Sequence, residues 1–133
     1  MTVSDYEEAL ALWQSTPGIG LSAADSRDAI TRFLERNGEL CFVARRGAQL
    51  VGTVLCGHDA RRGYIYHLAV RQGERRAGVG RALVQKALEA LGRQDIQKCH
   101  IFVYADNQEG LLFWRSTGWL ERPELIIMSK DIP

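Results

Sequence analysis

Residues 64–91 decide the fold of this chain, and they read YIYHLAVRQGERRAGVGRALVQKALEAL. Residues 64–70 alternate and are rich in aromatic and β-branched types, a pattern typical of a half-buried strand. From Val79 onward the apolar residues return on one helical face, at Val79, Leu83, Ala87 and Leu91. The stretch therefore predicts a strand that runs into a helix.

A glycine-containing turn, RRAGVG at residues 75–80, joins the predicted strand to the helix. Glycines at the start of a helix leave backbone N–H groups uncovered and allow a ligand to approach closely. These N–H groups and the positive end of the helix dipole point the same way, so the turn predicts an anion site.

Two glycines separated by one residue also occur at ordinary helix starts, so the flanking residues must separate the alternatives. A Walker phosphate loop requires Gly-Lys-Ser/Thr, and no Lys-Ser or Lys-Thr pair follows Gly78 or Gly80. A dinucleotide-binding fingerprint requires a third glycine, but Leu83 stands at that position. Both nucleotide motifs are therefore excluded.

The turn and its strand resemble motif A of the GNAT superfamily of acyl-CoA N-acyltransferases. The strand ends in Leu68-Ala69-Val70, and the turn supplies the family's Arg-x-x-Gly-x-Gly pattern as Arg75-x-x-Gly78-x-Gly80. A second stretch, NQEGLLFWRSTGW at residues 107–119, is similar to the family's Asn-x-x-Ala-x-x-x-Tyr-x-x-x-Gly-Phe. The resemblance covers about residues 6–128 and is greatest to small bacterial acetyltransferases of the YpeA type.

Length and composition predict one globular domain over residues 1–133, because 46% of the chain is apolar and 25% is charged. The formal charge of +1 indicates no attraction to nucleic acid or to an anionic membrane. With no long apolar run and no signal-peptide pattern, we expect a cytoplasmic protein. Three single cysteines, Cys41, Cys56 and Cys99, are expected to be reduced thiols rather than metal ligands.

The remaining elements are predicted from periodicity, capping and turn residues. A capping box, Ser4-x-x-Glu7, predicts a helix over residues 5–14, and Gly38 ends a second helix over 25–36. Further elements are strands over residues 40–45, 49–58 and 98–104, a helix over 107–116, and a hairpin of 119–122 with 125–130. The family's N-terminal strand should be short or missing. The resemblance implies an α/β (α+β) fold with a mixed, mostly antiparallel central sheet, a splayed parallel strand pair and flanking helices.

The resemblance implies acetyl-CoA as the cosubstrate, with no metal. Its pyrophosphate would take the amides of residues 77–81, and its pantetheine arm would pair with the strand edge at Leu68 and Val70. The backbone N–H of Val70 would hold the oxyanion. The implied cofactor-binding residues are Leu68, Ala69, Val70, Arg75, Arg76, Ala77, Gly78, Val79, Gly80, Arg81, Asn107 and Trp114. For the arginines a solvated surface pair, and for Asn107 a simple helix cap, remain alternatives.

Two family features are absent from this sequence. Trp114 replaces the tyrosine that often acts as general acid, and no glutamate stands at Tyr64 or Phe102. The thiolate of coenzyme A leaves without much help, so the first loss is tolerable. The candidate bases are His67 and Tyr66, with Tyr104 and His100 on the next strand. Histidine has the ordinary pKa best suited to the task, and a water chain is an equal alternative.

Strict strand alternation would place His67 on the face opposite Tyr66, so only one of the two could face the acceptor. In the family, helices 5–14 and 25–36 and the loop between them cover the acceptor side, which makes Trp13 and loop residues 17–21, with Ile19, candidate substrate contacts. Tyr104, on the predicted strand over 98–104, is a further candidate. A core tryptophan and a plain surface loop are the alternatives for the first two.

The predicted function is transfer of an acetyl group from acetyl-CoA to a primary amine of a small molecule or peptide, by direct attack in a ternary complex. The alternative is a catalytically weak acyl-CoA-binding or regulatory module of the same fold. Many family members form homodimers, and the sequence leaves a homodimer open.

Overall fold

The computed structural model describes residues 1–75 and 77–133, and the predicted contact Arg76 lies outside the described residues. The chain divides into two compact units, Met1–Phe102 and Val103–Pro133, called unit 1 and unit 2 here. Each unit is described by itself.

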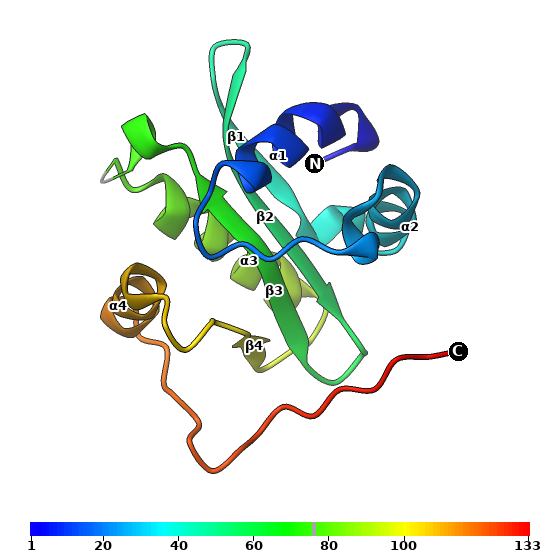
Figure 1. The fold of residues 1–133 in the computed structure, drawn as a ribbon, viewed down its shortest axis with the longest axis vertical. Coiled ribbons are helices and arrows are strands. Elements are labelled where there is room, and N and C mark those ends of the chain that lie inside the picture. The colour runs from blue at the N-terminus through cyan, green and yellow to red at the C-terminus, as the bar shows by residue number, and fades with distance from the viewer. Residues whose placement is uncertain (76) are drawn as a thin grey trace. The chain divides into compact units, whose positions relative to one another are not determined.

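Unit 1 contains a four-stranded sheet in the order β1-β2-β3-β4 (Figure 1). The strands are β1 (Phe42–Arg46), β2 (Gln49–His58), β3 (Gly63–Val70) and β4 (Cys99–Ile101). The first three strands form an antiparallel meander, and β3 and β4 are parallel. The predicted mostly antiparallel sheet with one parallel pair is confirmed, although β4 is shorter than the predicted strand over residues 98–104.

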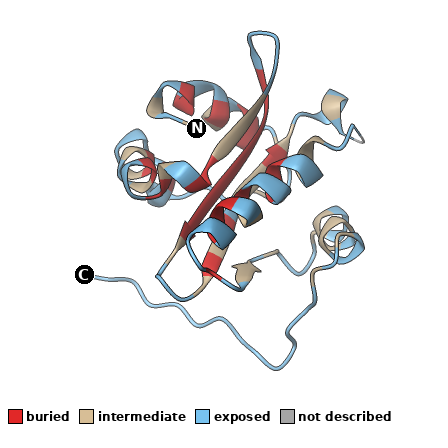
Figure 2. Cartoon of the chain, turned by 180° about the vertical axis from the view of Figure 1, so that it is seen from behind, coloured by how far each residue is buried: buried red, intermediate tan, exposed pale blue. Residues whose placement is uncertain are grey.

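Three helices cover the two faces of this sheet, as the front and back views show (Figures 1 and 2). On one face lie α1 (Tyr6–Gln14) and α2 (Arg27–Asn37), and on the other lies α3 (Val79–Arg93). Because α3 crosses from the end of β3 to the start of β4, these two strands run in the same direction.

The face under α1 and α2 holds the main hydrophobic cluster. Tyr6, Ala9 and Trp13 of α1 and Ile30 and Leu34 of α2 are buried at helical spacing. They pack against Leu50, Leu55 and Ala69 of the sheet. The apolar stripes seen in the sequence therefore are the inner faces of these helices.

The predicted capping box at Ser4 and Glu7 is wrong. The box is formed two residues earlier, because the Asp5 carboxylate accepts the Thr2 N–H at 2.9 Å and closes a 3₁₀ turn over Val3–Asp5. Ser4 lies inside that turn, where its hydroxyl bonds Thr2 instead of a helical N–H. Helix α1 consequently begins at Tyr6.

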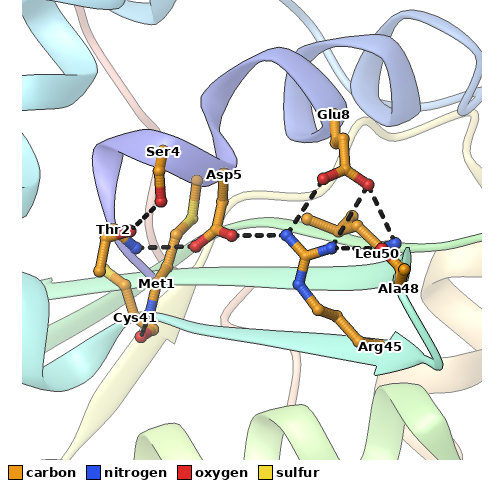
Figure 3. A network of polar contacts seen from close by, with 9 residues as sticks. All are labelled: Met1, Thr2, Ser4, Asp5, Glu8, Cys41, Arg45, Ala48 and Leu50. Atoms are coloured by element: carbon orange, nitrogen blue, oxygen red, sulfur yellow. Dashed lines mark hydrogen bonds and ion pairs between the residues drawn. The ribbon is translucent and has the colours of Figure 1, made fainter.

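A polar network ties the start of the chain to the β1–β2 hairpin (Figure 3). The Arg45 guanidinium lies between Asp5 and Glu8 and donates to both, with 2.6 Å from Nη2 to Asp5 Oδ1. The N-terminal ammonium of Met1 donates to the Cys41 carbonyl at 2.8 Å. The first residues are held by these contacts and form no strand, as the sequence analysis allowed.

The opposite face of the sheet admits α3 closely at two glycines. A Cβ at Gly63 would lie 2.6 Å from Leu91 Cδ1, and one at Gly52 would lie 2.9 Å from Leu83 Cδ1. Both leucines are buried. An added Cβ at either position would force a buried leucine to shift, so packing rather than backbone conformation favours glycine here. Cys41, Cys56 and Cys99 are free thiols on β1, β2 and β4 or next to them.

Unit 2 contains α4 (Gln108–Ser116), which begins at the predicted cap: the Asn107 carboxamide oxygen accepts the Gly110 N–H at 3.0 Å. The predicted hairpin over 119–122 and 125–130 is wrong, since no strand forms there among the described residues. A strand exists only where its N–H and C=O groups pair with a neighbour. Here the apolar side chains of 125–128 stay 59% to 91% exposed.

Among the described residues, no helix is both long and apolar enough to pass through a membrane.

Candidate active site

The N-terminus of α3 is open to an anion. Gly78 adopts the left-handed conformation with φ of +80° and caps the helix, and its carbonyl accepts the Ala82 N–H. The N–H groups of Val79, Gly80 and Arg81 precede this first helical bond, so the helix itself cannot satisfy them. They lie at the positive end of a helix of 15 residues. Three predicted cofactor contacts are thus brought together by one turn.

Arg75 links this turn to the end of β3. Its Nε donates to the Val70 carbonyl at 3.3 Å, and the side chain is exposed. A guanidinium carries five N–H donors in a planar fork, a geometry that suits a phosphate group. Ala77 and Arg81 are exposed beside it.

The end of β3 carries a free edge. Pairing of β3 with β4 stops at Ile65↔Ile101, whereas β3 continues to Val70. The Arg71 N–H donates to Val51 of β2 at 2.8 Å. Because successive residues alternate and Arg71 donates to β2, the backbone polar groups of Val70 point away from β2, toward the free edge. Within unit 1, β3 therefore continues for five residues past its last pairing with β4, and the splay expected from the resemblance stays a prediction.

A β-bulge interrupts β3 at His67. Thr53 pairs with Ala69 and Leu55 pairs with Tyr66, so two residues of β3 oppose one residue of β2. His67 takes the extra position with φ of +47°. The expectation that Tyr66 and His67 face opposite sides is wrong, because the bulge shifts the alternation by one residue.

Both side chains consequently lie against the layer of α1 and α2. The Tyr66 ring meets Phe33 of α2 edge-on, at 6.1 Å between centroids. The His67 ring lies 4.7 Å from Trp13 of α1. Burial raises the pKa of the Tyr66 phenol above its ordinary value of 10.0. Tyr66 therefore keeps its proton at neutral pH and is better suited to donate a hydrogen bond than to act as a base.

Both the imidazole ring and the backbone carbonyl of His67 make hydrogen bonds. Its Nε2 lies 2.6 Å from Asp25 Oδ1, and both side chains are largely buried, with 15% and 11% exposed. Its carbonyl accepts the Thr53 hydroxyl at 2.9 Å, and that hydroxyl accepts the Trp13 Nε1–H. Asp25 was missed by sequence reasoning. Its only signal was the pattern Ser22-x-x-Asp25, which indicates a cap rather than a contact with a residue 42 positions away.

Two predicted substrate contacts, Trp13 and Ile19, lie at the core cluster under α1 and α2. Trp13 is 1% exposed and belongs to the core, which favours the alternative of a core tryptophan over a substrate contact. Ile19 is partly buried and packs against the same core cluster. From this core position the Trp13 indole contacts the Thr53 hydroxyl and the His67 ring.

Three predicted site residues belong to unit 2. Asn107 caps α4, which is the simpler role considered for it. The Trp114 ring contacts Phe113 and Trp119, both T-shaped, at 5.0 and 4.9 Å. Tyr104 is exposed. In unit 1 lies the remaining base candidate, His100, whose ring centroid is 5.7 Å from that of Tyr64.

A hollow of about 800 Å³ lies elsewhere in unit 1. It is lined by the first three residues, the second half of α2, residues 38–40 and Gln94. None of the predicted site residues borders it, so this hollow is not the candidate active site.

Comparison with known proteins identifies the family of this chain. The sequence profile described as "Acetyltransferase (GNAT) family" matches residues 6–119. The chain belongs to this family. It is an acetyl-CoA-dependent N-acetyltransferase, and the GNAT fold expected from the sequence is confirmed.

Relatives of this GNAT protein are similar over most of the chain. It is 33% identical over 129 residues to the acetyltransferase YE1169 of Yersinia enterocolitica, covering 97% of this chain and 90% of that protein. It is also 33% identical over 98 residues to N-alpha-acetyltransferase 30 of Xenopus laevis, covering 70% of this chain and 36% of that protein. Among solved structures, the PaiA N-acetyltransferase of Thermoplasma acidophilum in complex with coenzyme A has a TM-score of 0.79 at 16% identity, covering 89% of this chain and 85% of that one.

Proposed function

We propose that this GNAT protein transfers the acetyl group of acetyl-CoA to a primary amine of a small molecule or peptide, by direct attack of the amine within a ternary complex. The observation that carries the proposal is that the open N-terminus of α3 and the free edge of β3 meet within one unit, next to each other in the chain.

Each part of acetyl-CoA has a matching group in unit 1. The pyrophosphate takes the N–H groups of residues 77–81, where charge and donors coincide, with Arg75 as a further phosphate donor. The amides of the pantetheine arm pair with Leu68 and Val70 as an added strand would. The Val70 N–H then donates to the carbonyl oxygen of the thioester as negative charge develops on it.

His67 is the base of the proposed reaction. It lies on the strand that would hold the thioester, three residues before the oxyanion donor Val70, and its ring has a fixed orientation. Tyr66 serves as a hydrogen-bond donor beside it. No acid is needed for the thiolate, because a thiol with an ordinary pKa near 8.5 departs readily. Asn107 and Trp114 remain proposed contacts of the cofactor, and Tyr104 remains a proposed contact of the substrate.

The acceptor is an amine of a small molecule or of a peptide. Amine acetylation agrees with the family, and the similarity to an N-alpha-acetyltransferase supports a peptide α-amine as one candidate. We also retain the prediction of a single domain, because the family match over residues 6–119 spans both units.

Thiol release tests this function. Purified protein with acetyl-CoA is assayed against small polyamines, aminoglycosides and short peptides with free α-amines, and coenzyme A is tested for protection against heat. We expect coenzyme A to raise the thermal midpoint and at least one amine to accelerate release. Protection without any acceleration would instead identify an acyl-CoA-binding module. Acceleration without protection by coenzyme A would contradict the proposed cofactor site.

A further inference from the structure

The contact between His67 and Asp25 joins two residues 42 positions apart, and it belongs to no motif in the sequence. Asp25 is held by two further hydrogen bonds, one to its carboxylate and one to its backbone carbonyl. Its Oδ2 accepts the Ser22 N–H at 2.9 Å, and its backbone carbonyl accepts the Tyr6 hydroxyl at 2.7 Å. The carboxylate therefore has one orientation available toward the imidazole.

This contact selects one tautomer of His67. An ionised carboxylate only accepts hydrogen bonds, and imidazole is in general the more basic partner, so the shared proton belongs to Nε2. The neutral ring then carries its lone pair on Nδ1. Among the described residues Nδ1 has no hydrogen-bond partner, although every fully buried side-chain nitrogen or oxygen there has one. Nδ1 is therefore reached by solvent.

The backbone of His67 is strained in support of this arrangement. A φ of +47° is uncommon for a residue with a side chain and costs about 1–2 kcal/mol. Such a conformation persists where its surroundings determine it, here through Thr53 on the carbonyl and Trp13 and Asp25 on the ring. The fold thus stabilises a histidine with an unpaired Nδ1 on the part of β3 that lies beyond its pairing with β4.

We propose that Asp25 is the positioning residue of acetyl transfer: it keeps the proton of His67 on Nε2, so that Nδ1 takes the proton of the attacking amine. The inference rests on the proposed function and deepens it. Asp25 acts through His67 and does not touch the substrate.

The reaction step balances with these groups. The amine nitrogen bonds to the thioester carbonyl carbon, the carbon–sulfur bond breaks, and coenzyme A leaves as the thiolate. Nδ1 of His67 takes one proton from the amine nitrogen, so the product is a neutral amide. The Asp25 carboxylate stabilises the resulting imidazolium, and that proton then passes to solvent or to the thiolate.

Asp25→Asn is the decisive variant. Its amide oxygen still accepts the Ser22 N–H, but its NH₂ group faces Nε2 and must donate to it. The proton of the neutral ring then moves to Nδ1, and the base is blocked. Asp28→Asn, an exposed change three residues later in the same segment, is the matched control.

Imidazole ¹⁵N NMR reads the tautomer directly and does not depend on activity. The chain has three histidines, and loss of one signal set in His67→Gln assigns that residue. We expect Nε2–H in the wild type and in Asp28→Asn, and Nδ1–H in Asp25→Asn. Nδ1–H in the wild type overturns the proposal, even if Asp25→Asn fails to fold.

Kinetics test whether the tautomer matters for transfer. We expect kcat to fall by about 10²-fold or more in Asp25→Asn, with the KM for acetyl-CoA changed less than about twofold. In a His67→Gln background the same substitution should change kcat less than about twofold, because its effect passes through the imidazole. An equal loss in both backgrounds overturns the proposal.

Failure of the proposed function has a different signature. In that case no amine accelerates thiol release by the wild-type protein, which overturns the proton-transfer role while the tautomer measurement still reports the Asp25–His67 contact.

Discussion

The indole Nε1–H of Trp13 donates a hydrogen bond of 2.9 Å to the Thr53 hydroxyl, which in turn donates to the His67 carbonyl at 2.9 Å. Both Trp13 and Thr53 are fully buried. A single hydroxyl thus connects α1 to the bulge of β3, and the position of the candidate base depends on the docking of an N-terminal helix.

Replacing Thr53 by valine should show this dependence. The change keeps the shape of the side chain but leaves the Trp13 N–H and the His67 carbonyl without their buried partner. We expect unfolding free energy to fall by about 1–3 kcal/mol in urea titrations, and kcat to fall with it. Thr31→Val in α2 is the control, because the Thr31 hydroxyl only bonds the Arg27 carbonyl within the helix. Equal effects at both positions would contradict the connecting role.

Gly78→Ala should weaken coenzyme A binding more than it weakens the fold. Gly78 and Gly47 both have positive φ, +80° and +60°, and a Cβ at either meets nothing within 4 Å. Alanine should therefore cost each fold about 1–2 kcal/mol. Only position 78 lies at the predicted pyrophosphate site, so calorimetry should give about a tenfold rise in Kd there and less than twofold at position 47. A similar loss of affinity in both variants would argue against this site.

Gly63→Ala should destabilise unit 1 by crowding. Its Cβ would lie 2.6 Å from Leu91 Cδ1, and the buried leucine has little room to move. We expect a loss of about 1–3 kcal/mol in chemical denaturation. Gly92 follows Leu91 in α3, and a Cβ there would meet nothing within 4 Å. Gly92→Ala should therefore raise the free energy of unfolding by about 0.5–1 kcal/mol. A neutral Gly63→Ala would show that the Leu91 side chain shifts at little cost and would contradict the crowding.

Arg45→Met should lower the thermal midpoint at neutral pH, and the difference from wild type should close in acid. Burial alone would raise the pKa of Asp5, but the Thr2 N–H and the Arg45 guanidinium outweigh it and lower the pKa below its ordinary 3.8. The hydrogen bonds from Arg45 and the Leu50 N–H lower the pKa of Glu8 below 4.5. A carboxyl with a lowered folded pKa stabilises the fold above its unfolded pKa and loses that effect as pH falls.

Melting curves between neutral pH and about pH 3 test this ordering. Arg32→Met, on an exposed position of α2, serves as the control and should track the wild type throughout. A constant difference between Arg45→Met and wild type across this range would show that Arg45 stabilises by packing of its alkyl chain rather than by charge.

The sequence by itself determined the kinds of elements in unit 1 and the open end of α3. Hydrophobic periodicity is a local property, so α1, α2 and the strands β1 to β3 were predicted with bounds within about two residues. The glycines of the turn also predicted the start of α3, because the positive φ that Gly78 adopts is a local requirement. The family followed from two motifs, whose spacing along the chain is also local information.

Tertiary structure decided the chemistry around His67. A bulge depends on which residues of β2 and β3 pair, so no pattern within β3 could show that Tyr66 and His67 share a side. The same reason explains the failed hairpin in unit 2: strand propensity is local, but a strand needs a partner that only the folded chain supplies.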